Sequence, residues 1–99
     1  MSTSIEHDET GQRYVIHVDG EQAGFTQARV EGDVVVMDHT VVDDAFSGQG
    51  MAAELVGAAL QDVRASGRRV RPTCSYVRHY LDEHPELADL VEPAGEPSA

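Results

Sequence analysis

The valine-rich run at residues 34–42 and the apolar repeat that follows it form the strongest pattern in the chain. Residues 34–42 read VVVMDHTVV, with apolar side chains on both faces, which is typical of a central strand covered on both sides. Over residues 49–66 the apolar positions recur at helical spacing, and Gly67 follows where helices commonly end. The apolar positions of this predicted helix are Met51, Ala52, Leu55, Val56, Ala59, Leu60 and Val63.

Shorter strand patterns precede this strand and helix. Residues 14–18 read YVIHV and end at an Asp-Gly pair, residues 19–20, which favours a tight hairpin turn. The returning strand is expected over residues 21–30, and the Glu-Gly-Asp turn at residues 31–33 leads into the valine run. These segments predict an antiparallel three-strand meander.

A parallel strand and a second helix are expected after the long helix. The predicted strand covers residues 69–73, and because a helix separates it from residues 34–42, a right-handed crossover makes the two strands parallel. Ser75 is the expected N-cap of the second helix, and Pro85 ends it. The buried stripe of that helix is expected to be Val77, Tyr80 and Leu81.

The C-terminal residues complete an α/β (α+β) domain. A last apolar turn, made by Leu87, Leu90 and Val91, is expected to close the core. Residues 92–99 are acidic, proline-rich and small, so we expect one domain over residues 1–91 and a disordered tail over residues 92–99.

Charge limits the classes of partner. The chain of 99 residues carries seven Lys plus Arg against eighteen Asp plus Glu, a net charge of −11, which repels nucleic acid and anionic membranes. A cationic partner is favoured electrostatically, although an acidic surface also serves solubility alone. With no signal-peptide pattern, no membrane-spanning stretch and one cysteine, the chain is expected to be cytoplasmic.

A glycine turn joins the valine run to the long helix. Backbone amides at such a helix start attract phosphate oxygens, and those of Ser47, Gly48, Gln49, Gly50 and Met51 are candidates. A side chain at position 48 or 50 would block either the backbone dihedral or the phosphate. The alternative is that this glycine-rich connection is only a turn.

Three motifs in this order resemble a known family. They are His-Thr at residues 39–40, Gly-Gln-Gly at residues 48–50 and Pro-Thr-Cys-Ser-Tyr at residues 72–76. The chain resembles a compact, single-domain GNAT-superfamily N-acetyltransferase over about residues 14–91, which implies a minimal GNAT-like fold. The superfamily commonly carries Arg or Gln three residues before the first glycine, where this chain has Ala45.

The resemblance implies an acetyl-coenzyme A site in which the strands splay apart near residues 39–40. The expected cofactor contacts are Thr40, Val41, Val42, Phe46, Ser47, Gly48, Gln49, Gly50, Met51, Ala52, Ser75, Tyr76 and Tyr80. Arg68, Arg69 and Arg71 form the only basic cluster, which either meets the cofactor's 3′-phosphate or serves solubility.

Cys74 and His39 are the candidate catalytic residues. Cys74 precedes a helix start, where a thiolate is favoured, so it could accept an acetyl group; it could equally line the pocket during direct transfer, or be a small buried hydrophobe. Direct transfer needs a base, for which His39 is the first candidate, and Asp38 could orient it; the alternative is that His39 is a strand histidine with satisfied hydrogen bonds. Tyr76 or Tyr80 could protonate the leaving thiolate, or Tyr80 could belong to the core.

The resemblance implies acetyl transfer to an amine of a small molecule or a protein lysine, with a basic protein or peptide among the possible acceptors. The alternatives are a non-catalytic acyl-coenzyme A binding or sensing module and a thioesterase. No metal site is expected, because the other histidines lack ligand spacing with Cys74. A monomer or a weak dimer is expected.

Overall fold

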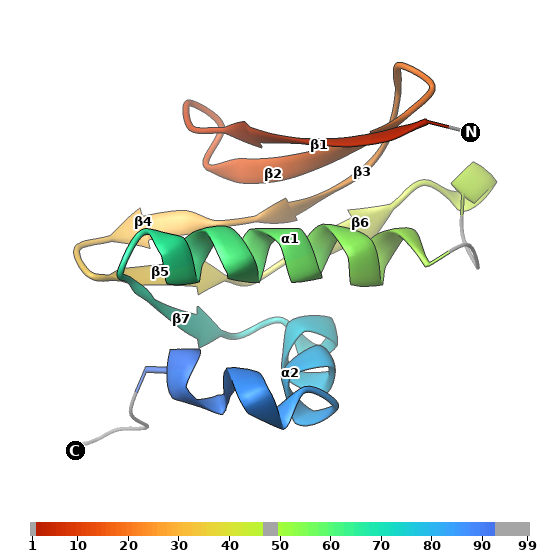
Figure 1. Ribbon diagram of the computed structural model, residues 1–99. Coiled ribbons are helices and arrows are strands. Elements are labelled where there is room, and N and C mark those ends of the chain that lie inside the picture. Colours follow the sequence, from red (N-terminus) through yellow and green to blue (C-terminus); the bar gives the residue numbers. More distant parts are fainter. Residues whose placement is uncertain (1, 47–49, 93–99) are drawn as a thin grey trace.

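The computed structural model describes residues 2–46 and 50–92. One long helix runs across the middle of the molecule, with the N-terminal hairpins on one side of it and the C-terminal elements on the other (Figure 1). The elements in chain order are β1 (Thr3–Asp8), β2 (Arg13–Val18), β3 (Glu21–Gln27), β4 (Arg29–Glu31), β5 (Val34–Met37), β6 (Thr40–Val42), the 3₁₀ turn η1 (Asp44–Phe46), α1 (Met51–Ala65), β7 (Arg69–Pro72), α2 (Ser75–Asp82) and the 3₁₀ helix η2 (Pro85–Leu90).

A four-stranded antiparallel sheet in the order β1-β2-β3-β6 forms the N-terminal half. The predicted hairpin between β2 and β3 is confirmed: Asp19 and Gly20 have φ of 52° and 85°, as a two-residue turn of type I′ requires. Strand β1 is not predicted from the sequence, because it lies at the sheet edge and Ile5 is its one large apolar residue.

The valine run is two strands instead of one. Strand β5 pairs antiparallel with β4 and parallel with β7, whereas β6 pairs with β3 in the other sheet. The predicted strand over residues 21–30 is interrupted as well, at the buried Ala28 between β3 and β4. Both chain segments therefore cross from one sheet to the other, and the meander is antiparallel as predicted but divided.

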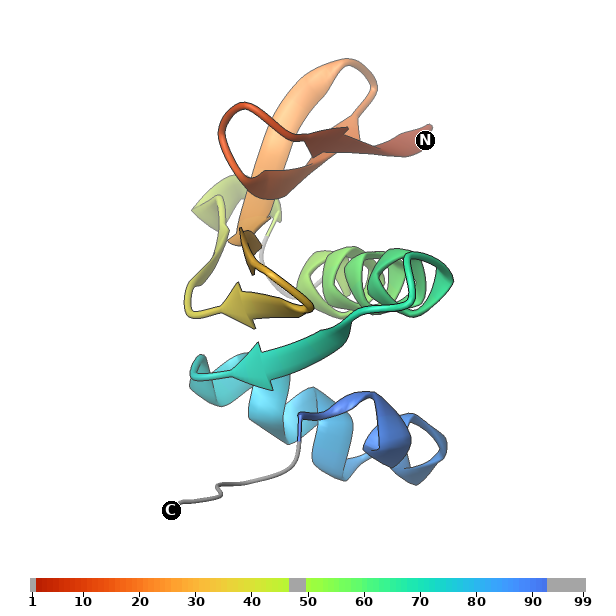
Figure 2. The ribbon, with the colours of Figure 1, turned by 90° about the vertical axis from the view of Figure 1, so that its left-hand side faces the viewer.

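Helix α1 matches the predicted apolar repeat and covers one face of both sheets. Its buried residues are Met51, Leu55, Val56, Ala59, Leu60 and Val63. Gly67, at φ 79°, ends the helix in a Schellman motif: its N–H donates to Arg64 O at 3.1 Å, and the Arg68 N–H donates to Val63 O at 3.3 Å. Figure 2, which views α1 nearly end-on, shows it beside the strands, with α2 and η2 beyond β7.

Strand β7 is parallel to β5, as the crossover predicts, with register from Val34↔Arg69 to Met37↔Pro72. The predicted Ser75 cap is wrong by one residue, because Cys74 occupies the N-cap and Ser75 is the first residue of α2. Cys74 has the extended backbone that is usual for an N-cap residue, with φ of −81° and ψ of 130°.

The C-terminal apolar turn closes the core as expected. Val77, Leu81, Leu87 and Leu90 are buried, whereas Tyr80 is half-buried. The backbone continues through Glu92, whose N–H donates to Val70 O at 2.9 Å. Residues 93–99 of the predicted tail lie outside the described residues. Within the described part of the chain, no helix combines the length and apolar character needed to span a bilayer.

Candidate functional site

The sheet opens where β5 gives way to β6. Strand β7 follows β5 as far as the Met37↔Pro72 pair, and the next two amides, of Thr73 and Cys74, both donate to Met37 O at 3.1 and 3.0 Å. From there the chain after β7 turns into α2, whereas β6 pairs with β3. The two segments separate at residues 39–40, where a splay was predicted.

A line of hydrogen-bonding side chains crosses this opening. The Cys74 thiol donates to Thr40 Oγ1 at 3.6 Å, Thr40 and Thr26 share a hydroxyl contact of 2.8 Å, and Thr26 Oγ1 donates to His39 O at 3.4 Å. Because the His39 carbonyl can only accept, the hydrogen bonds run in one direction: Cys74 donates to Thr40, Thr40 donates to Thr26, and Thr26 donates to the carbonyl. Thr26 has no exposed surface, which makes this polar contact structurally fixed.

The two faces of β6 look onto different parts of the molecule. Val42 packs against the core on the side of α1, and Thr40 shares that face because side chains alternate along a strand. Val41 points the other way and is 38% exposed. The predicted cofactor contact of Val41 is therefore limited to its backbone if the cofactor lies on the α1 side.

His39 and Cys74 are not brought together. The His39 ring lies 6.2 Å from that of Phe25, and Phe25 pairs with Val41, so His39 belongs to the face opposite α1. Cys74 instead reaches Thr40 on the α1 side. The His39 imidazole and the Cys74 thiol thus flank β6 from opposite sides.

Asp38 does not orient His39 as predicted. Its carboxylate pairs with Arg29 at 3.3 Å across the β4–β5 hairpin. Arg29 also binds Glu31 at 2.9 Å, so the Asp38 carboxylate belongs to a surface ion-pair cluster. His39 is left with solvent access and without that partner.

An open groove of about 310 Å³ lies at the start of α1. Strand β6, η1, the first turn of α1 and α2 line it through Val42, Phe46, Gly50, Met51, Ala52, Ala53 and Tyr76. All of these except Ala53 are predicted cofactor contacts. The predicted Ser47, Gly48 and Gln49 lie outside the described residues.

Gly50 begins α1 in the left-handed conformation, at φ 77° and ψ 12°. As a glycine it has no side chain to cap the helix, and no side chain of the described residues caps it either, so its first amides suit an anion. A Cβ built at Gly50 would meet nothing within 4 Å, so the backbone angle and not crowding by the protein demands glycine here.

The two candidate tyrosines have different places. Tyr76 lines the groove, and its pKa is raised by burial and then by the neighbouring Tyr80 and Glu83. Tyr80 packs its hydroxyl against α1, at a point where a Cβ on Gly57 would come within 2.6 Å of it. Tyr76 is therefore the tyrosine that a ligand in the groove can touch.

The predicted 3′-phosphate role of the arginine cluster does not fit the structure. Arg68, Arg69 and Arg71 follow the C-terminal end of α1, and the groove lies at its other end. Fifteen helical residues span roughly 22 Å. Arg71 is also bound to Glu92 and lies 3.7 Å from Glu31. Ser75, a further predicted contact, is exposed at the start of α2 and does not line the groove.

Thr26 is a residue of the opening that the sequence motifs do not include. The sequence does hint at its role, because Thr26 lies at an inward-facing position of a short strand pattern, and a buried polar side chain there needs a hydrogen-bonding partner. The partner, Thr40, is its cross-strand neighbour and is invisible without the β3–β6 register.

Known proteins share both the sequence and the architecture. Protein NATD1 of Homo sapiens is 31% identical over 83 residues, which cover 82% of this chain and 74% of that protein; in Gallus gallus the identity is also 31%, with 82% and 76% covered.

Solved structures agree at the level of the fold. A GCN5-like protein from Staphylococcus aureus has a TM-score of 0.69 at 23% identity, covering 95% of this chain and 90% of that one. The AAC(6′)-Iy structure with the bisubstrate analog CoA-S-monomethyl-acetylneamine has a TM-score of 0.52 at 18% identity, covering 88% and 65%. The family model described as GCN5-related N-acetyl-transferase matches residues 13–90. The chain therefore belongs to the GCN5-related N-acetyltransferases, a family of acetyltransferases.

Proposed function

We propose that this protein binds acetyl-coenzyme A in the groove at the start of α1 and transfers the acetyl group to a primary amine. The observation that carries the proposal is that the groove is lined by Val42 and Tyr76, which lie two residues after Thr40 and Cys74 at the opening between β6 and the end of β7. The amides that begin α1 suit a pyrophosphate, and the apolar walls suit the pantetheine arm. The thioester would then lie near Thr40 and Cys74.

Cys74 is the proposed acetyl carrier. Its sulfur attacks the thioester carbonyl, a new C–S bond forms as the coenzyme C–S bond breaks, and the thiol proton passes to the departing coenzyme thiolate. Tyr76, which lines the groove, is proposed to relay that proton: its hydroxyl protonates the coenzyme thiolate and takes up the proton that leaves Cys74. An acceptor amine then attacks the acetyl-cysteine and restores the thiol.

The acceptor is proposed to approach from the opposite face of β6, and its amine would reach acetyl-Cys74 through the opening between β6 and the end of β7. A shallow pocket of about 120 Å³ lies there, lined by Gln22, Ala23, Gly24, Phe25, Val41 and Asp43. An exposed valine and a carboxylate suit an ammonium group on an aliphatic stem. A lysine side chain of a basic protein or a small polyamine has this chemistry. His39, on the same face, is placed to take a proton from the amine.

Intact mass separates this proposal from its alternatives. After incubation with acetyl-coenzyme A, the protein should gain one acetyl group that Cys74→Ala cannot gain, and lysine-rich peptide or spermidine should remove it and become acetylated. A protein that binds the cofactor without acetylation of itself or of an amine is the sensing module. Release of free acetate without amine acetylation indicates a thioesterase. Either outcome rejects the proposed transfer.

A further inference from the structure

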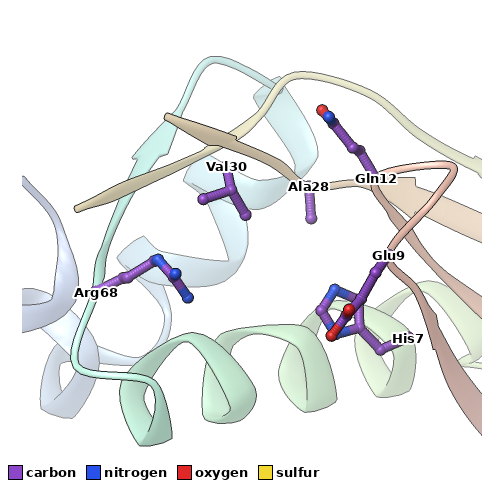
Figure 3. Close-up of a pocket in the computed structure, with 6 residues that line it drawn as sticks. All are labelled: His7, Glu9, Gln12, Ala28, Val30 and Arg68. Atoms are coloured by element: carbon purple, nitrogen blue, oxygen red, sulfur yellow. The ribbon is translucent and has the colours of Figure 1, made fainter. Parts of the chain in front are cut away.

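A second cavity, of about 240 Å³, lies at the opposite end of α1 from the cofactor groove. The residues that line it come from β1 and the β1–β2 turn, from β4 and the residue that precedes it, and from the loop that joins α1 to β7. These segments lie near the C-terminal end of α1 in Figure 1. Its lining residues are His7, Glu9, Gln12, Ala28, Val30 and Arg68. Figure 3 shows Arg68 reaching into the cavity from one side and His7 and Glu9 standing on the other, with Val30 and Ala28 between them.

Arg68 is held in place without an acidic partner. Its Nε donates to Gly32 O at 3.2 Å, which fixes the guanidinium and leaves both terminal NH₂ groups free for another acceptor. Among the described residues no carboxylate lies within ion-pair distance of it, in a chain with eighteen acidic residues and seven basic ones. A half-buried arginine without a carboxylate suits an external one, which it can bind in a bidentate manner.

The facing wall carries the His7 imidazole and the Glu9 carboxylate, with Asp62 behind them. The rings of His7 and Tyr14 stack at 4.2 Å with an interplanar angle of 5°, and the Tyr14 hydroxyl donates to Asp62 on α1. His7 Nδ1 lies 3.6 Å from Asp62 and 3.9 Å from Glu9, so two carboxylates converge on one imidazole. This wall favours a cationic group.

The geometry points to a binding site for a small zwitterion, an unbranched ω-amino acid whose carboxylate meets Arg68 and whose ammonium meets Glu9. The methylene chain between the two charges would lie on Val30, which is 43% exposed, and on Ala28. The cavity volume of 240 Å³ equals that of about eight waters in the liquid, which suits a ligand such as 4-aminobutyrate. Such a ligand has no net charge, so the acidic protein does not repel it.

A titration monitored by ¹H–¹⁵N correlation spectra tests this site. 4-Aminobutyrate, butyrate and butylamine are compared at one pH and ionic strength, at up to about 50 mM. We expect saturable shifts at the amides of Gln12, Ala28, Val30 and Arg68, with the zwitterion binding at least about tenfold more tightly than either singly charged analogue.

Two variants show which end of the ligand each wall holds. Arg68→Gln should weaken 4-aminobutyrate at least about tenfold, whereas Arg69→Gln, the same charge change at an exposed neighbour, should not. Glu9→Gln, at a side chain that is 84% exposed, should weaken binding of the zwitterion but leave binding of butyrate unchanged. Absence of saturable shifts, equal binding by Arg68→Gln, or equal binding of butyrate and the zwitterion would overturn the inference. Coenzyme A binding, measured separately, reports on the other end of α1.

Discussion

Helix α1 offers a matched pair of glycines that separates helix stability from cofactor binding. Gly50 begins the helix at φ 77°, and Gly67 follows its end at φ 79°. A Cβ at either position meets nothing within 4 Å, so alanine at each position suffers the same backbone strain without a clash. Only Gly50 lines the groove.

The expected magnitudes follow from this geometry. An alanine in the left-handed region costs about 1–2 kcal/mol, so each variant should melt about 4–8 °C lower for every kcal/mol lost. Gly50→Ala should in addition turn the Gly50 and Met51 amides away from a bound phosphate. A hydrogen bond to a charged group contributes about 1.5–3 kcal/mol, so coenzyme A affinity should fall at least tenfold.

Thermal melting and calorimetric titration with coenzyme A measure both quantities. Comparable melting losses with weaker binding in Gly50→Ala alone would support the phosphate site. Equal coenzyme A affinity in Gly50→Ala and Gly67→Ala would refute it, because strain without a binding defect means that the helix start does not touch the ligand.

Further predictions concern the thiol, the buried hydroxyls and an ion pair. Cys74→Ala should keep coenzyme A affinity within about threefold but lose acetyl incorporation in intact-mass spectra; retained incorporation would place the acetyl group elsewhere. Thr26→Val should cost about 1–3 kcal/mol in denaturant unfolding and alter the pH profile of Cys74 alkylation, and Thr26→Ser should restore that profile; an unchanged profile contradicts the hydrogen-bonded line. Hydrogen bonding to Arg71 lowers the pKa of Glu92 below 4.5, so this pair stabilises the fold above that pH and the contribution is lost as pH falls through the lowered value. Arg71→Gln should therefore lower the melting temperature more at pH 7 than at pH 3, and equal losses at both would count against the pair.

Local patterns account for most of the architecture. The Asp19-Gly20 turn, the apolar stripe of α1 and its stop at Gly67 each depend on residues close together in the chain. The parallel pairing of β5 and β7 follows from the helix between them. Each of these features is determined by residues that are close together in the sequence, so it could be predicted.

The arrangement of the site depends on contacts between residues that are far apart in the sequence. The division of residues 34–42 between two sheets sends His39 and Cys74 to opposite faces, and a continuous apolar run gives no sign of it. Thr26 meets Thr40 only through the β3–β6 register. Motif order located the groove residues, whereas the relation of the two candidate catalytic groups required the fold.

The most direct test of the account is a ¹H–¹⁵N titration of the full chain with coenzyme A. The proposed binding mode predicts saturable shifts along the groove and at the strand opening, at Thr40, Val42, Phe46, Gly50, Met51, Ala52, Ala53 and Tyr76. The amides of β1 and of the loop after α1 should not move. Absence of shifts at saturating coenzyme A, or shifts confined to that far end, would contradict the claim that the start of α1 holds the cofactor.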